Sequence, residues 1–168
     1  MKPYLYPPQP WALGALLMST LLLFASGAVA QAPSIEGTYR LVSRTLRDGT
    51  VLKQPDVMGL QTYTKSYRNF NILSKDADGQ FVSRSIVATY TLTPTDYIEN
   101  TLFHILVRRQ EIRREVSTQP ERSSVTLDGG RIHIRRSATS LEQRVTLFEG
   151  NKFTATSPAS VDLWEKVE

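Results

Sequence analysis

The sequence predicts an all-β domain folded as an antiparallel up-and-down β-barrel, and three observations support this prediction. First, glycine-containing turns separate runs rich in Val, Ile, Thr, Tyr and Phe, as β-hairpins require. Second, several of these runs alternate, as Ile86, Ala88 and Tyr90 do against Val87 and Thr89, so one face of each strand can be buried. Third, no apolar pattern with the 3.6-residue period of a helix is long enough to predict one.

Four turn sequences imply at least eight strand arms. The turns are Asp48-Gly49, Asp78-Gly79, Asp128-Gly129-Gly130 and Glu149-Gly150-Asn151. The strands are expected at residues 38–46, 60–64, 67–74, 81–92, 98–112, 124–127, 131–136, 144–148, 153–156 and 161–167. Such a meander hides its unpaired edges most completely by closing on itself, which favours a barrel over an open sheet. A two-sheet sandwich remains the alternative.

Residues 1–30 have the pattern of a signal peptide. Lys2 is their only charge, an apolar run extends from Trp11 to Phe24, and Ala28-Val29-Ala30 suits signal peptidase. We expect cleavage after Ala30, which leaves residues 31–168 as one domain, periplasmic or secreted and without a stable membrane insertion. The alternative is an uncleaved anchor, because the apolar run approaches the length of a bilayer span. The chain has no cysteine, so neither disulfides nor a lipid anchor on cysteine can form.

The first strand and its successors resemble a known family. The segments are Gly37-Thr38-Tyr39-Arg40-Leu41-Val42-Ser43, then Asp48-Gly49, Gly59-Leu60-Gln61-Thr62-Tyr63-Thr64, Ala88-Thr89-Tyr90-Thr91-Leu92, Leu127-Asp128-Gly129-Gly130-Arg131-Ile132 and Asp162-Leu163-Trp164-Glu165-Lys166-Val167. In this order they resemble bacterial lipocalin-like domains of the calycin group, although lipocalins usually carry Trp where this chain has Tyr39. The resemblance implies a barrel whose interior holds one small hydrophobic or amphipathic molecule.

Period-two alternation gives candidate residues for the interior. If Tyr39 faces inward, so do Leu41 and Ser43. The predicted ligand-binding residues are Tyr39, Leu41, Ile86, Tyr90, Phe103 and His104. Phe103 and His104 have opposite parity on one strand, and the sequence leaves open which of them faces inward. An inward His104 could hydrogen-bond a ligand oxygen, or it could be a structural residue. In the second interpretation the aromatic residues fill the barrel, which then serves as a structural or interaction module.

Catalytic and metal-binding signals are not found in the sequence. With two histidines far apart and no thiolate, we expect no metal site and no cofactor. The chain has no Gly-x-Ser-x-Gly elbow, Ser-x-x-Lys motif or phosphate-binding glycine loop. Binding without chemistry is therefore the first hypothesis. The structural or interaction module is the second, and an enzyme of the isomerase or cyclase kind is the third.

An arginine-rich stretch is the remaining candidate for a contact surface. It comprises Arg108, Arg109, Arg113 and Arg114, with Glu111 and Glu115 between them. An anionic partner could dock there, or the glutamates could pair with the arginines across strands and form a charged rim. Nucleic acid is not expected, because no aromatic residues interleave with the arginines and the formal net charge is only +4.

Overall fold

A computed structural model describes residues 33–167, apart from 77, 110, 117–118 and 137–144. The proposed signal peptide, residues 1–30, lies outside the described residues. The described part belongs to one unit, Ala32–Glu168, and all of its regular structure is β-strand. The strands are β1 (Gly37–Leu46), β2 (Val51–Leu52), β3 (Val57–Tyr63), β4 (Tyr67–Lys75), β5 (Phe81–Leu92), β6 (Asp96–Arg108), β7 (Glu111–Glu115), β8 (Glu121–Asp128), β9 (Arg131–Arg136), β10 (Val145–Glu149), β11 (Lys152–Thr156) and β12 (Ser160–Lys166).

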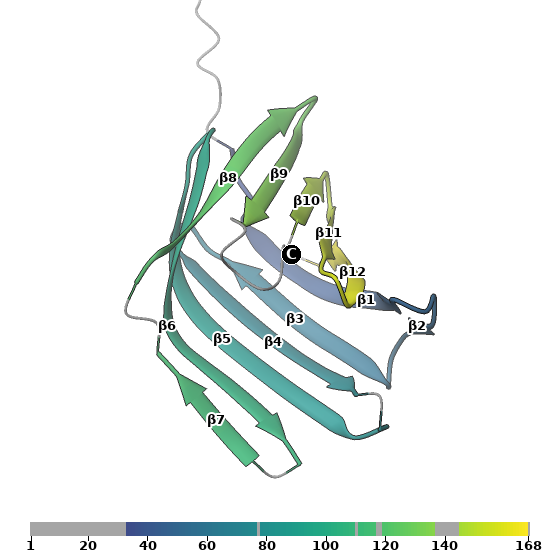
Figure 1. The fold of residues 1–168 in the computed structure, drawn as a ribbon. Coiled ribbons are helices and arrows are strands. Elements are labelled where there is room, and N and C mark those ends of the chain that lie inside the picture. Colours follow the sequence, from purple (N-terminus) through teal and green to yellow (C-terminus); the bar gives the residue numbers. More distant parts are fainter. Residues whose placement is uncertain (1–32, 77, 110, 117–118, 137–144, 168) are drawn as a thin grey trace, which may run out of the picture. The chain divides into compact units, whose positions relative to one another are not determined.

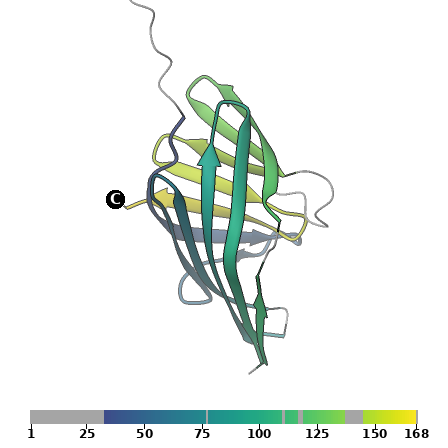
Figure 2. The same cartoon turned by 90° about the vertical axis from the view of Figure 1, so that its left-hand side faces the viewer.

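Ten of these strands form a closed antiparallel barrel, which confirms the all-β barrel prediction. The hydrogen-bonded order is β1-β3-β4-β5-β6-β8-β9-β10-β11-β12, and β12 pairs with β1 to close the ring. The short strands β2 and β7 extend the sheet beside β1 and β6. In Figures 1 and 2 the strands wrap around a common interior, and β5 and β6 extend well beyond the short strands β9 to β12.

The predicted turns lie between strands. Gly129 and Gly130 both have positive φ, 53° and 83°, as the two-residue loop of a tight hairpin requires. The predicted strand at residues 98–112 is wrong in one respect, because the chain reverses within it and forms the β6–β7 hairpin. Arg109 has a φ of 50°, and this left-handed conformation turns the chain where the strand composition alone gave no signal.

Aromatic side chains fill part of the interior. Tyr39 lies edge-on to Phe153 with ring centroids 5.0 Å apart, and Phe153 stacks on Trp164 at 5.4 Å. Tyr63 and Tyr90 meet edge-to-face at 5.6 Å. These rings are all buried, and their packing ties the first strands of the barrel to the last ones.

A register shift in β1 changes which of its side chains face inward. Leu41 pairs with Trp164, but the pairing then shifts so that Ser43 pairs with Leu163 and Arg44 with Asp162. The prediction that Ser43 follows Leu41 into the interior is therefore wrong, because the irregularity inserts one residue and reverses the alternation. Arg44 takes the inward position instead.

Candidate functional site

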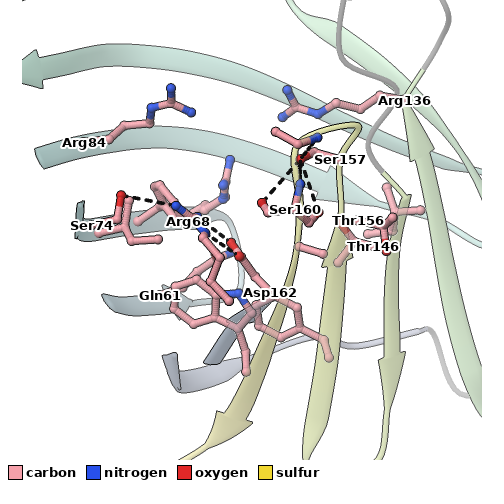
Figure 3. A pocket seen from close by; sticks show the side chains of 18 of the residues that line it. Gln61, Arg68, Ser74, Arg84, Arg136, Thr146, Thr156, Ser157, Ser160 and Asp162 are labelled. Atoms are coloured by element: carbon pink, nitrogen blue, oxygen red, sulfur yellow. Dashed lines mark hydrogen bonds and ion pairs between the residues drawn. The ribbon is translucent and has the colours of Figure 1, made fainter. Parts of the chain in front are cut away.

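The barrel interior holds a partly open cavity of about 240 Å³ beside the aromatic core. Residues from nine of the ten barrel strands line it, together with the turn between β11 and β12. Its charged residues are Arg44, Arg68, Arg84, Glu99, Arg136 and Asp162. Figure 3 shows Arg84 and Arg136 reaching toward one another over the cavity, with Ser157 and Ser160 on the turn beside them. The interior of this barrel is thus strongly polar on one side.

A buried ion pair joins β4 to β6. The Arg68 Nη1 atom donates to both carboxylate oxygens of Glu99, at 2.8 and 2.9 Å. The Tyr97 hydroxyl donates to Glu99 Oε2 at 2.6 Å, and Arg136 Nη2 from β9 lies 3.5 Å from Glu99 Oε1. Arg68 and Glu99 are 8% and 5% exposed, so water contacts neither charge to a large extent. Each charge offsets the desolvation cost of the other.

Two opposing effects set the pKa values in this cluster. Burial favours the neutral form of each group, whereas a nearby opposite charge favours the ionised form. Burial alone would raise the pKa of Glu99, but the positive charges of Arg68 and Arg136 override it and hold that pKa below its ordinary value. Burial also opposes the charge on Arg68, and the Glu99 carboxylate more than offsets this and raises the pKa of the guanidinium. Burial raises the pKa of Tyr97. The pair is therefore ionised and the neighbouring phenol is neutral at pH 7.

A second ion pair joins β1 to β12. Arg44 Nε and Nη2 each donate to one oxygen of Asp162, both at 2.7 Å. Arg44 Nη1 also donates to the Ser74 hydroxyl of β4 at 3.2 Å. This bidentate geometry is the strongest form of arginine–carboxylate contact, and it uses both oxygens of Asp162.

Two buried donors at the cavity have no hydrogen-bond partner within the described structure. They are the Nε–H of Arg68 and the Nε1–H of Trp164, and both residues line the cavity. Trp164 is only 1% exposed. An unsatisfied buried donor costs roughly 1–3 kcal/mol, so these two atoms lower the stability of the fold around the cavity.

Apolar side chains form the rest of the cavity wall. They are Phe70, Ile72, Val82, Ile134, Phe153, Ala155 and Trp164, together with the Tyr63 and Tyr97 rings. Gln61, which donates to the Tyr63 hydroxyl, also faces this space. The combination of apolar walls with a few convergent polar groups is typical of small-molecule sites.

None of the six predicted ligand-binding residues lines this cavity. Tyr39 and Tyr90 are buried in the aromatic core, where their hydroxyls donate to the carbonyl oxygens of Ile35 at 3.2 Å and Thr64 at 2.6 Å. Leu41 is buried too, and it borders a separate pocket of about 400 Å³ formed with residues of β3, β4 and β5.

The pairing of β6 with β5 shows which of Phe103 and His104 faces inward, a question that the sequence left open. Ile86 pairs with His104, whereas Val87 pairs with Phe103. Because Ile86 packs against the core cluster, His104 lies on the inner face of the sheet. Phe103 lies on the outer face and is 41% exposed, which places it outside the interior for which it was proposed.

The charged cavity residues were missed because charged positions were not considered as interior ones. A signal was present for five of them, each in phase with an inward apolar residue of its own strand: Arg68 with Phe70, Arg84 with Ile86, Glu99 with Tyr97, Arg136 with Ile134 and Asp162 with Trp164. A charged residue in phase with a buried apolar stripe indicates a buried ion pair. No such signal existed for Arg44, because the register shift in β1 separates it from the alternation of Tyr39 and Leu41.

The arginine-rich stretch carries several ion pairs. Arg108 Nη2 lies 3.0 Å from Asp76 Oδ2, and Arg109 pairs with Asp78. Both aspartates belong to the β4–β5 connection, so the two pairs link neighbouring hairpins. Arg113 and Arg114 are exposed on β7. Aspartates from a neighbouring turn thus neutralise Arg108 and Arg109.

Comparison with protein-family models, with curated proteins and with solved structures finds no match to this chain. The lipocalin-like resemblance therefore stays a prediction. Within the described residues there is no helix of the length and apolar character needed to cross a membrane.

Proposed function

We propose that this protein is an exported, lipocalin-like binding protein that holds one small amphipathic molecule in its barrel cavity without chemically altering it. The observation that carries the proposal is the cavity itself, in which apolar walls converge with a few polar side chains, among them Gln61, Ser157 and Ser160. A ligand with a polar group and an apolar body would match both parts of this wall.

The shape of the cavity supports binding of a small molecule. Its volume of about 240 Å³ lies just below the roughly 300–1,000 Å³ of pockets for drug-sized ligands. Aromatic and aliphatic walls would contribute about 25 cal/mol for each Å² of apolar ligand surface removed from water. The polar groups would set the orientation of the ligand, because each has a fixed position on a barrel strand.

The proposal of export rests on the sequence of residues 1–30, whose charge, apolar run and Ala28-Val29-Ala30 site have the order of a signal peptide. A barrel without cysteine folds by packing and hydrogen bonding alone, so an oxidising compartment would not alter its bonding. We expect the protein recovered from the periplasm or medium to begin at Gln31, as N-terminal sequencing would report. Retention in the membrane fraction with an intact N-terminus would contradict export and favour the anchor.

Native mass spectrometry of the full-length protein is the direct test of binding. We expect an additional mass of one small molecule that survives desalting. The matched variants are Ala155→Leu, which adds volume inside the cavity, and Thr154→Leu, which adds volume at the next position of β11, on the opposite face. Ala155→Leu should abolish retention and Thr154→Leu should preserve it.

Two results would contradict the proposal. One is a bare protein that takes up neither short-chain nor aromatic probe molecules. The other is equal retention by Ala155→Leu and wild type, with both folded by circular dichroism, since the ligand would then lie elsewhere. The first result would favour the alternative of a non-catalytic structural or interaction module.

A further inference from the structure

The strand β7 has one edge that no other described strand covers. It pairs with residues 104–108 of β6, whereas β8 pairs with a different part of the same strand, residues 96–99. Figure 1 shows β7 beside the end of β6 that lies away from the short strands β9 to β12. The N–H and C=O groups along the outer side of an edge strand can pair with a strand of another chain.

The side chains of β7 alternate between the two faces of the sheet. Ile112 pairs with Val107, which has the parity of the outward Phe103, so Ile112 lies on the outer face and is 61% exposed. Glu111 and Arg113 lie on the other face, and both are exposed. Within the described part of the chain, neither of these two charges has an ion-pair partner.

Two copies of β7 can pair with each other antiparallel about a two-fold axis. A residue on that axis faces its own copy, and residues at equal distances before and after it face one another. The axis can pass through Ile112, Arg113 or Arg114, the three central positions of the strand. Opposite charges that face each other across strands are stabilising and like charges are destabilising, so the sequence of β7 distinguishes these three registers.

Of the three registers, the one with the axis at Ile112 pairs opposite charges and brings no like charges together. In it Ile112 meets its own copy, and Glu111 of each molecule faces the partner's Arg113. With the axis at Arg113, two copies of that arginine meet, and Glu111 faces the partner's Glu115. With the axis at Arg114, two arginines again lie opposite each other. The first register therefore gives one apolar contact and two cross-strand ion pairs.

The position of β7 leaves space for a second molecule. In an antiparallel pair the partner's barrel lies beyond the β6–β7 turn, so the two barrels stand at opposite ends of the assembly. Charged residues on an edge strand commonly discourage association, because they meet like charges on a neighbouring copy. Glu111 and Arg113 alternate in sign on one face, so in the register centred on Ile112 the same residues favour association.

We infer that the outer edge of β7 is a homodimer interface, in which the β7 strands of two copies pair antiparallel with Ile112 opposite its own copy. The sheet then continues from β5, β6 and β7 of one molecule into β7, β6 and β5 of the other. The overlap of the two strands is short, so the dimer is weak and reversible, as is typical of interfaces below about 1,200 Å². This inference does not depend on the proposed binding function.

The absence of cysteine from the chain allows a direct test of the register. Facing residues of antiparallel strands have Cα atoms about 4.5–5.5 Å apart, within the roughly 4.4–6.8 Å that a disulfide spans. Mild oxidation of the full chain carrying Ile112→Cys should therefore give a covalent dimer that a reductant reverses. Arg114→Cys is the matched control and should crosslink at least tenfold more slowly, because its copy lies four residues away, about 14 Å along the strand.

Charge reversal tests which contacts hold the two copies together. Glu111→Arg sets two positive charges opposite each other at the partner's Arg113, and Arg113→Glu sets two negative charges together in the same way. In sedimentation equilibrium each variant should dimerise at least fivefold more weakly than wild type. An equimolar mixture of the two variants should recover dimers, because every facing pair again has opposite charges. Arg135→Glu, at an exposed position of β9, is the matched control and should dimerise as wild type does.

Three results would overturn the inference. One is a wild-type protein that remains monomeric at a concentration of about 1 mM, where even weak complexes form. Another is equal crosslinking of Ile112→Cys and Arg114→Cys, which would exclude the proposed register. The third is a pair of charge-reversal variants, folded by circular dichroism, that dimerise as tightly as wild type or do not recover dimers on mixing. If a charge variant does not fold, the crosslinking comparison alone decides.

Discussion

The buried Arg68–Glu99 pair allows a quantitative prediction about stability. Replacing Glu99 with Gln keeps the size of the side chain but removes the charge that compensates Arg68, whose side chain is only 10% exposed. Breaking a buried ion pair by removing one partner costs about 3–5 kcal/mol. Glutamine retains some hydrogen bonding to Arg68 and Tyr97, so we expect about 3 kcal/mol.

Urea denaturation followed by circular dichroism measures this loss. With an m value of about 2 kcal/mol/M, a loss of about 3 kcal/mol lowers the unfolding midpoint by about 1.5 M. Glu149→Gln is the matched control, because Glu149 pairs with Arg131 through side chains that are 59% and 50% exposed. Exposed pairs contribute about 0–1 kcal/mol, so this variant should shift the midpoint far less.

The pH dependence gives a second measurement of the same pair. The pKa of Glu99 is lowered in the folded protein from its ordinary value of 4.5, so its contribution is complete above that value and is lost as the pH falls through the lowered pKa. Wild type and Glu99→Gln should therefore converge in stability at acidic pH.

A double substitution tests the physical reason. In Arg68→Met with Glu99→Leu both charges are absent, so most of the lost stability should return. The reasoning is refuted if Glu99→Gln costs no more than the surface control at pH 7, or if the double variant is less stable than Glu99→Gln.

Three further predictions concern packing, the second ion pair and alkaline pH. Gly59→Ala should lower stability by about 1–3 kcal/mol, because its Cβ would lie 2.9 Å from Trp164 Cη2 and 3.0 Å from the Asn71 carbonyl oxygen; thermal unfolding should show the loss, and a Trp164→Phe background should relieve only the part that comes from Trp164. Arg44→Met should cost about 2–3 kcal/mol in urea denaturation, since hydrogen bonds to charged groups contribute about 1.5–3 kcal/mol; a loss below 1 kcal/mol would contradict this. Burial raises the pKa of Tyr63 from 10.0 to about 12, so its stabilising contribution is present below pH 10 and is lost as the pH rises through 12; ultraviolet titration against Tyr63→Phe should show the late ionisation, and its absence would refute the burial argument.

The inner faces of the strands show where period-two alternation predicts burial correctly and where it does not. Tyr39, Leu41 and Tyr90 were expected inside the barrel from alternation alone, and all three are buried. Alternation succeeds here because successive side chains of a strand always point to opposite faces. It fails at Ser43, since the register shift in β1 adds one residue, and a shift of one residue exchanges the two faces.

The sequence by itself determined the strands, their turns and the all-β class, because composition, alternation and turn glycines act over a few neighbouring residues. Only the tertiary structure decided the contents of the cavity. Arg44 and Asp162 are 118 positions apart, and they meet because β1 and β12 become neighbours when the barrel closes. Arg68 and Glu99 are 31 positions apart, and they meet inside the barrel from β4 and β6, on either side of β5. The free energy of a buried charge depends on the partner that faces it across the sheet, and that partner is set by register and closure.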